Sequence, residues 1–238
     1  IAEMAFQTCT SLHSVELPPG LDAISSHTFD GCSGLVAVKI PDSVTKIGKC
    51  AFADCCRLES IDFPADLVKL GDRAFRGCTA LVSVAISGRL TQIPDRAFNG
   101  CSSLVSVTFP KTVTGIAQYA FSDCTQLQSA PLPPLLRTVD TSAFQGCCSL
   151  RAVTIPGKVV TLDNSAFKEC ASLERIALPS TLRRIGDRTF EACVRLSSVT
   201  LPDRLESIGD HAFSHCRSLM TIAVPSRVSR IFPLAFSH

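Results

Sequence analysis

Phenylalanine returns every 23 residues along this chain without one interruption. The series comprises Phe6, Phe29, Phe52, Phe75, Phe98, Phe121, Phe144, Phe167, Phe190, Phe213 and Phe236. A fixed period of this length is the signature of a repeat protein, because a 23-residue unit cannot bury its apolar positions alone and must stack on its neighbours. We therefore count positions within each unit from this phenylalanine, which is position 0.

The rest of the unit repeats just as regularly. Cys stands at +3, Leu at +6, an aliphatic residue at +9, an apolar residue at +11, Pro at +12, Leu or Val at +15 and an aliphatic residue at +18. Ala130 at +9 and Ser87 at +12 are exceptions, and Ala or Thr precedes each Phe. The consensus is A-F-x-x-C-x-x-L-x-x-V-x-I-P-x-x-L-x-x-I-x-x-x, and ten such units lie between the first and the last Phe.

Each unit divides into a predicted strand and a predicted turn. Val84 and Ile86 alternate with polar or small residues, which indicates a short strand with one apolar face, and the following Pro position ends it. Asp72 is placed to cap a helical turn over 73–76, and Gly77 to end it in a left-handed conformation. The three-residue spacings beyond it favour a 3-10 coil. We expect one parallel strand and one short helical or 3-10 turn per unit.

The strand segment L-x-x-V-x-I resembles the leucine-rich repeat core, and P-x-x-L-x-x-I-x-x-x-A-F-x-x-C resembles the BspA-like class of that family. The resemblance covers nearly the whole chain. It implies a right-handed, curved leucine-rich-repeat solenoid with its strands in one parallel sheet. Better-known classes carry Asn at +14, which is absent from that position here. The BspA-like class occurs widely in bacterial and protist proteins, many of them on cell surfaces.

Composition narrows the range of partners. The net charge is +2, Trp is absent and there is one Tyr, so neither a basic surplus nor aromatic stacking predicts a nucleic-acid partner. The sequence has no apolar run that predicts a transmembrane segment, and no visible signal peptide. Residues 1–238 form a single array that is in frame at both ends. We expect a fragment of a longer chain, or ends covered by something else, because solenoids need capping units.

The 13 cysteines do not form a disulfide pattern. Ten occupy one column of the solenoid, where we expect buried thiols that act as small apolar side chains. Cys50, Cys56 and Cys148 fall outside this column and are expected to be more exposed. The odd number of cysteines favours a reducing compartment, though only weakly.

No motif predicts catalysis, a cofactor or a metal site. A catalytic cysteine needs a nearby base, whereas the column cysteines have apolar neighbours. His211 and His215 have the spacing of two metal ligands, but their outward positions favour ordinary surface histidines. We therefore expect a protein that is not an enzyme.

Two surfaces are candidates for binding a protein partner. The first is the outward face of the sheet, formed by positions +8 and +10. Its side chains are mostly small and uncharged, and we expect this face to be flat. The candidate residues of this sheet face are Ser14, Glu16, Lys39, Ser60, Asp62, Ser83, Ser106, Thr108, Pro131, Thr154, Arg175, Thr200 and Thr221. The second is a basic edge at +14, +16 and +17, on the loop between strand and turn. The candidate residues of this basic edge are Arg137, Lys158, Arg183, Arg184, Arg204, Arg227 and Arg230.

One unit departs from the pattern between Gln126 and Leu136. Ala130 replaces the inward aliphatic residue, and Pro131 lies within the strand, where it cannot donate a backbone hydrogen bond. We expect a local defect in the sheet there, either as a contact site for a partner or as neutral variation.

The sequence supports two functions. The first is a non-catalytic protein-interaction scaffold, which can be a subunit of a larger assembly. The second is a cell-surface adhesion or recognition module of the BspA-like type. The partner's identity stays open, as does the choice between the cell surface and an intracellular assembly.

Overall fold

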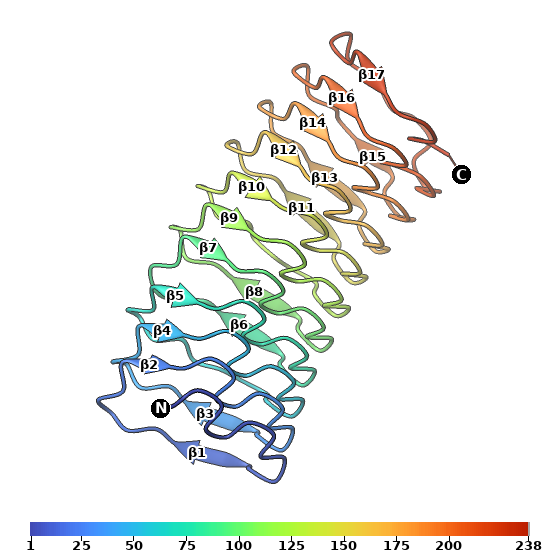
Figure 1. The fold of residues 1–238 in the computed structure, drawn as a ribbon. Coiled ribbons are helices and arrows are strands. Elements are labelled where there is room, and N and C mark those ends of the chain that lie inside the picture. The colour runs from blue at the N-terminus through green and yellow to red at the C-terminus, as the bar shows by residue number, and fades with distance from the viewer. Residues whose placement is uncertain (238) are drawn as a thin grey trace.

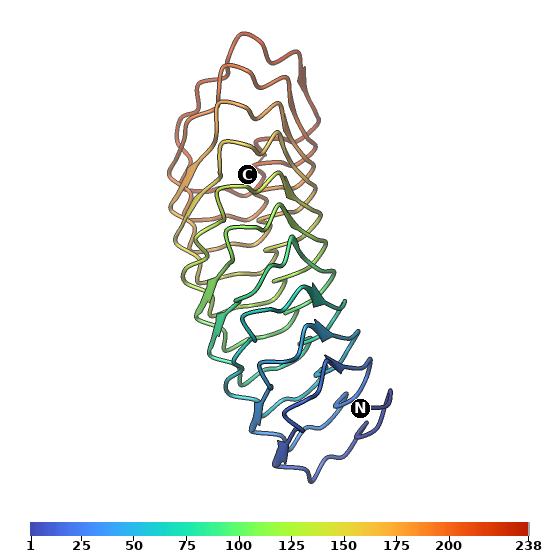
Figure 2. The same ribbon diagram turned by 90° about the vertical axis from the view of Figure 1, so that its left-hand side faces the viewer.

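A computed structural model describes residues 1–237, and the chain coils as a solenoid with one turn per 23-residue unit (Figure 1). The turns stack in sequence order from the N-terminus to the C-terminus (Figure 2). The predicted parallel-strand solenoid is therefore confirmed. Strands of successive units pair in parallel with a 23-residue offset, so that each residue faces its own counterpart in the next unit.

The first row of strands occupies the predicted segment around +8 to +10. It comprises β1 (Ser14–Glu16), β3 (Ala37–Lys39), β6 (Ser83–Ala85), β8 (Ser106–Thr108), β11 (Ala152–Thr154), β13 (Arg175–Ala177) and β15 (Ser198–Val199). The sequence predicted one continuous sheet, whereas this row of strands is interrupted. It forms β1-β3, β6-β8 and β11-β13-β15, with interruptions at residues 60–62 and 129–131. The predicted strand of the tenth unit, at 221–223, is also absent.

A second row of strands lies at +17 and +18, where the sequence pattern, which predicts one strand per unit, gave no sign of it. It comprises β2 (Ala23–Ile24), β4 (Lys46–Ile47), β5 (Lys69–Leu70), β7 (Gln92–Ile93), β9 (Gly115–Ile116), β10 (Thr138–Val139), β12 (Thr161–Leu162), β14 (Arg184–Ile185), β16 (Ser207–Ile208) and β17 (Arg230–Ile231). The two rows lie on different sides of the coil (Figure 1). The second row forms a three-stranded sheet, β2-β4-β5, and a seven-stranded sheet from β7 to β17.

The gap between β5 and β7 lies where the repeat departs from its consensus. In other units the amide at +15 donates to the carbonyl of the +12 proline, as Leu67 does to Pro64. Ser87 takes that proline position in the fourth unit, and Gly88 follows it with φ +90°. There the amide of Arg89 donates to the carbonyl of Leu67 instead (2.8 Å), which changes the turn before β7.

The third side of the coil is an extended series of turns and not the predicted helical turn. No residue among 1–237 lies in a helix, so Asp72 has none to cap. The physical reason lies two residues before and two residues after each Phe from Phe6 to Phe213, where the backbone is left-handed, as at Arg73 (φ 57°) and Gly77 (φ 72°). This geometry aims the amides of Arg73, Phe75 and Gly77 at carbonyls of the next unit (2.8–2.9 Å).

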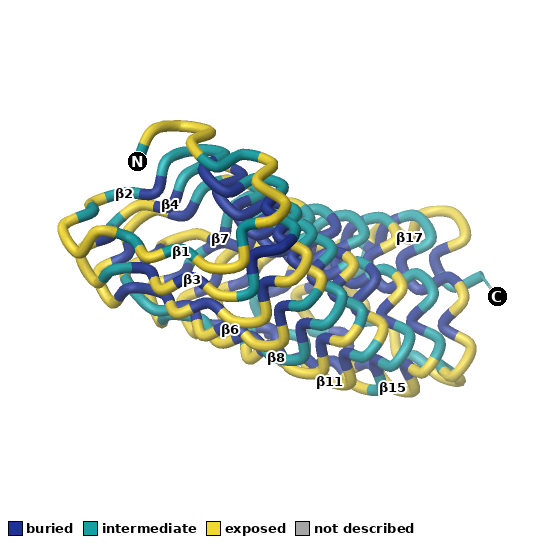
Figure 3. Tube along the Cα trace, turned by 90° about the horizontal axis from the view of Figure 1, so that it is seen from below, coloured by how far each residue is buried: buried dark blue, intermediate teal, exposed yellow. Residues whose placement is uncertain are grey.

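The core is a continuous stack of phenylalanine rings. Neighbouring rings in the series from Phe6 to Phe236 are stacked with centroids 5.2–5.9 Å apart. Phe63 and Phe109 add edge-on contacts to Phe75 and Phe121. Buried positions line the inside of the turns from Ile24 to Cys216 (Figure 3), whereas residues 1–23 include no buried position. The repeat positions predicted to be apolar thus form one core running the length of the molecule.

Candidate interaction surface

The face of the first strand row points its +8 and +10 side chains into solvent. In β6, Ser83 and Ala85 are exposed and Val84 between them is buried, as strand alternation requires. The candidate residues of the sheet face are all exposed except Ser106, which is half-buried. The structure therefore places the predicted residues in two parallel columns that follow the axis of the solenoid, spaced by one strand per unit.

The predicted sheet defect at Gln126–Leu136 is confirmed. Pro131 and its neighbours form no strand, and a single bridge joins Ser106 to Ser129. The second interruption of the row, at Ser60 and Asp62, has no proline within the segment, and nothing in the sequence predicted it. These candidate residues stay exposed even though their backbone is irregular.

The sheet face is hollowed and not flat as the sequence suggested. Three hollows lie between strands of the first row and the turns that follow them. The hollow beside the defect, of about 470 Å³, is lined by Pro131, Ala152 and Thr154. A second, of about 570 Å³, is lined by Glu16 and Lys39, which lie opposite each other in register. A third, of about 560 Å³, lies beside Thr200.

The basic edge belongs to a different surface from the sheet face. All seven of its predicted residues are exposed. They lie on or just before strands of the second row, such as Arg184 on β14 and Arg230 on β17, and not on a loop that leads to a helical turn. Arg183 forms an ion pair with Glu206 of the next unit (3.0 Å), which neutralises part of the edge.

The predicted thiol column is buried from Cys32 to Cys216, whereas Cys9 in the first unit is exposed. Each buried Sγ from Cys32 onward donates a hydrogen bond to the carbonyl oxygen of the preceding unit's Phe, as Cys101 does to Phe75 (3.2 Å). Burial raises the pKa of Cys101 to about 12. These thiols are therefore held protonated and pack as apolar groups.

The cysteines outside the column behave in two ways. Cys56 and Cys148 are exposed, as predicted. The prediction for Cys50 is wrong, because its short side chain two residues before Phe52 is covered and only 7% exposed. Ser142 at the same position of its unit is also buried, whereas the longer Arg188 there reaches solvent. Burial raises the pKa of the Cys50 thiol.

The paired histidines occupy outward turn positions. His211 Nδ1 lies 2.8 Å from a carboxylate oxygen of Asp210, and His215 is exposed. Within residues 1–237 there is no group of three or more side chains placed to hold a metal ion. The same described part of the chain has no helix long and apolar enough to cross a membrane.

Comparison with known proteins places this geometry in context. The family model described as the BspA type leucine-rich repeat region (6 copies) matches residues 1–128 and 114–238. A leucine-rich repeat protein from Bacteroides ovatus is similar in structure, with 25% identity and a TM-score of 0.56 over 97% of this chain and 77% of that one. The leucine-rich repeat protein of T. pallidum is 29% identical, with a TM-score of 0.53 over 77% of each chain. No curated protein matches the sequence.

Proposed function

Because the chain belongs to the BspA-type leucine-rich repeat family, we propose that it is a non-catalytic scaffold that binds a protein partner across its sheet face. The observation that carries the proposal is the pair of exposed columns at +8 and +10. They repeat unit after unit on a backbone held by the phenylalanine stack behind it. A partner would meet a pre-ordered surface, so little conformational entropy would be lost by the scaffold on binding.

The chemistry of the sheet face suits contact with a folded protein. Its side chains are mostly Ser, Thr and Ala, which let a partner's backbone approach closely. Arg175 is the long, exposed side chain of the kind that often dominates binding energy. The hollows beside Pro131, Glu16 and Thr200 would receive protruding side chains of the partner.

The thiol column supports the non-catalytic part of this proposal. A catalytic cysteine needs an accessible thiolate and an adjacent base. The column thiols instead donate to backbone carbonyls, and burial raises the pKa of Cys101 and Cys216 to about 12. These thiols therefore contribute to the core, and we assign binding to the exposed columns.

The family also supports a second candidate, a cell-surface adhesion or recognition module. It would use the same sheet face. The two candidates differ in the partner, which would be a subunit of a stable assembly in the first case and a ligand outside the cell in the second.

The first experiment is purification from the native source, with identification of any protein held at fixed stoichiometry. Binding of that protein is then compared between S83R/T108R, on the sheet face, and T91R/T138R, on exposed positions of the second row. We expect at least a tenfold loss of affinity, about 1.4 kcal/mol, for the first pair only. Equal affinity in both variants would refute the assignment of the face.

A further inference from the structure

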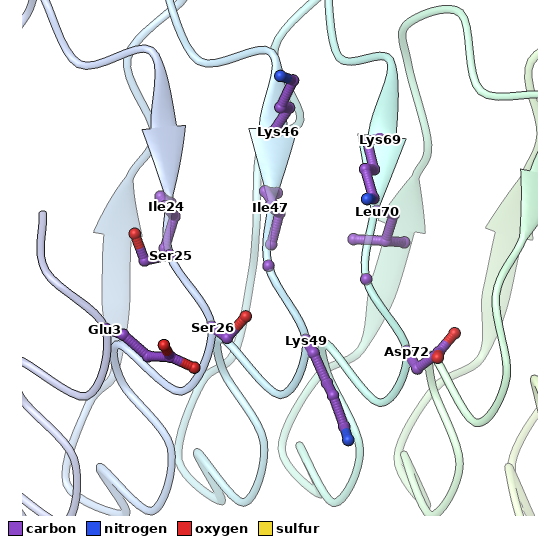
Figure 4. A pocket seen from close by; sticks show the side chains of 12 residues that line it. Glu3, Ile24, Ser25, Ser26, Lys46, Ile47, Lys49, Lys69, Leu70 and Asp72 are labelled. Atoms are coloured by element: carbon purple, nitrogen blue, oxygen red, sulfur yellow. The ribbon is translucent and has the colours of Figure 1, made fainter.

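An open groove of about 490 Å³ lies on the second strand row near the N-terminus (Figure 4). We call it the lysine groove. Lys46 and Lys69 line it from the adjacent strands β4 and β5, and Lys49 lines it from the loop that follows β4, with the side chains of Lys46 and Lys49 pointing in opposite directions. Glu3 lies at one end of the groove and Asp72 at the other (Figure 4). None of these residues belongs to the sheet face or to the predicted basic edge.

The three lysines of the groove outnumber the two carboxylates that line it. Lys46 and Lys69 are direct partners in the parallel register, and like charges in that arrangement repel each other. All three groove lysines are exposed, and none forms an ion pair with another residue of the described chain. An anionic ligand between the two strands would relieve the repulsion.

The floor of the groove is bare backbone. Gly48 and Gly71 occupy +19 in adjacent units, and a Cβ on Gly71 would lie 2.4 Å from the amide nitrogen of Lys49. No side chain can therefore cover that amide from position 71. Within residues 1–237, the amides of Lys49 and Asp72 donate hydrogen bonds to no acceptor.

The same chain shows what fits these amides at its other end. The amide of Asp187, at +20, donates to Asn164 Oδ1 (2.9 Å), and the amide of Asp210 donates to Asp187 Oδ1 (3.0 Å). In both cases the acceptor oxygen comes from the +20 side chain of the preceding unit. In the groove that +20 residue is Lys49 before Asp72, and a lysine side chain has no acceptor to offer.

We propose that the lysine groove binds the carboxylates of a short acidic segment of a protein partner. One carboxylate takes the amides of Lys49 and Asp72, in the way that Asp187 takes the amide of Asp210. Lys46 and Lys69 supply charge-assisted hydrogen bonds and the charge that draws the segment in. Glu3 and Asp72 close the ends with negative charge, which favours a short segment over a long polyanion such as a nucleic acid or a sulfated glycan.

The test is calorimetric titration of the whole chain with an acetylated, amidated tetraglutamate peptide. We expect binding to the unmodified protein and at least tenfold weaker binding to K46A/K69A. The matched control K111A/R217A removes two exposed cationic side chains outside the groove, the sheet face and the basic edge, and should bind as the unmodified protein does. Absence of binding to the unmodified protein, or equal binding by K46A/K69A, would overturn the proposal. So would inorganic sulfate binding as tightly as the peptide, because it would identify a small inorganic ion as the ligand.

A second pair of variants tests the amide floor. K49D places a carboxylate where Asp187 stands in its own unit, so we expect it to accept from the amide of Asp72, to raise the melting temperature and to exclude the peptide. K49A removes the same lysine charge without adding an acceptor and should retain weaker binding. If K49D and K49A bind the peptide equally, the amides are not part of the site. The sheet face takes no part in these experiments, so their outcome is separate from that of the scaffold proposal.

Discussion

At the scale of the residue, the Phe and the Cys of the repeating unit each make two kinds of contact. The phenylalanine ring stacks on the rings above and below, and its backbone carbonyl accepts a hydrogen bond from the Sγ of the next unit's cysteine. The cysteine therefore fills a small apolar site and satisfies a buried carbonyl, which a valine in the same place would leave without that bond. Thr28 and Thr189, which replace Ala before Phe, are buried and bond to backbone carbonyls within their turns.

This arrangement predicts two classes of thiol reactivity. A water-soluble disulfide reagent attacks thiolates, so we expect Cys9, Cys56 and Cys148 to react first in the folded protein. The buried column should stay nearly unreactive even at pH 9, because burial raises the pKa of Cys101 and Cys216 to about 12. Mass spectrometry of the labelled peptides measures this order, and labelling in urea gives the control in which all 13 react. Uniform labelling of the folded protein would contradict the buried column.

At the scale of the element, two of the interruptions in the strand rows coincide with departures from the consensus. Ser87 and Gly88 coincide with the gap between β5 and β7, and Pro131 coincides with the gap between β8 and β11. Proline has no amide hydrogen to donate to the neighbouring strand. The backbone at Ser129 still approaches β8, with the amide of Val107 3.4 Å from its carbonyl oxygen. Pairing of this segment with β8 is therefore begun at Ser129, and the donor at position 131 is missing.

We predict that P131T extends the pairing across this gap. Thr occupies the same position in β8 and β11, so the side chain suits the exposed face. One restored hydrogen bond should stabilise the fold by about 1 kcal/mol. Amide hydrogen exchange should show new protection at position 131, and urea unfolding measures the free energy. P134T changes an exposed turn proline nearby and serves as the control. A loss of stability in P131T with no new protection would show that the proline holds this segment in its irregular form.

At the scale of the whole molecule, the solenoid is a one-dimensional array. Paired strands and stacked rings join neighbouring units in sequence order. Stability in such an array is close to a sum of unit and interface contributions. The losses of stability caused by two core substitutions should therefore be non-additive only when the substituted units are in contact.

Double-mutant cycles in the phenylalanine stack test this directly. Phe121 and Phe144 stack at 5.3 Å, so F121L and F144L should show a coupling energy of about 0.5–3 kcal/mol. Phe52 and Phe190 lie six units apart, and F52L with F190L should add to within about 0.5 kcal/mol. Urea unfolding of the single and double variants gives both values. Strong coupling in the distant pair would mean that the array unfolds as one rigid block.

The sequence by itself determined the period, the stack of Phe rings, the thiol column and the two exposed columns. In an in-register array each residue packs against its own counterpart one unit on, so periodicity reports the contact directly. The sheet defect at Pro131 could also be predicted from the sequence, because proline has no amide hydrogen to donate. The family resemblance followed from the same positions.

Only the tertiary structure decided the features that depend on contacts between unlike positions. The second strand row was not predicted, because the residues at +16 and +17 are both exposed. A strand is recognised in a sequence from the alternation of apolar and polar residues, and this segment has no such alternation. Left-handed residues on both sides of Phe replaced the predicted helical turn, since backbone hydrogen bonds to the next unit outweigh local capping. The lysine groove arises because Gly48 and Gly71 leave backbone amides bare between adjacent strands, a juxtaposition that exists only once the units are stacked.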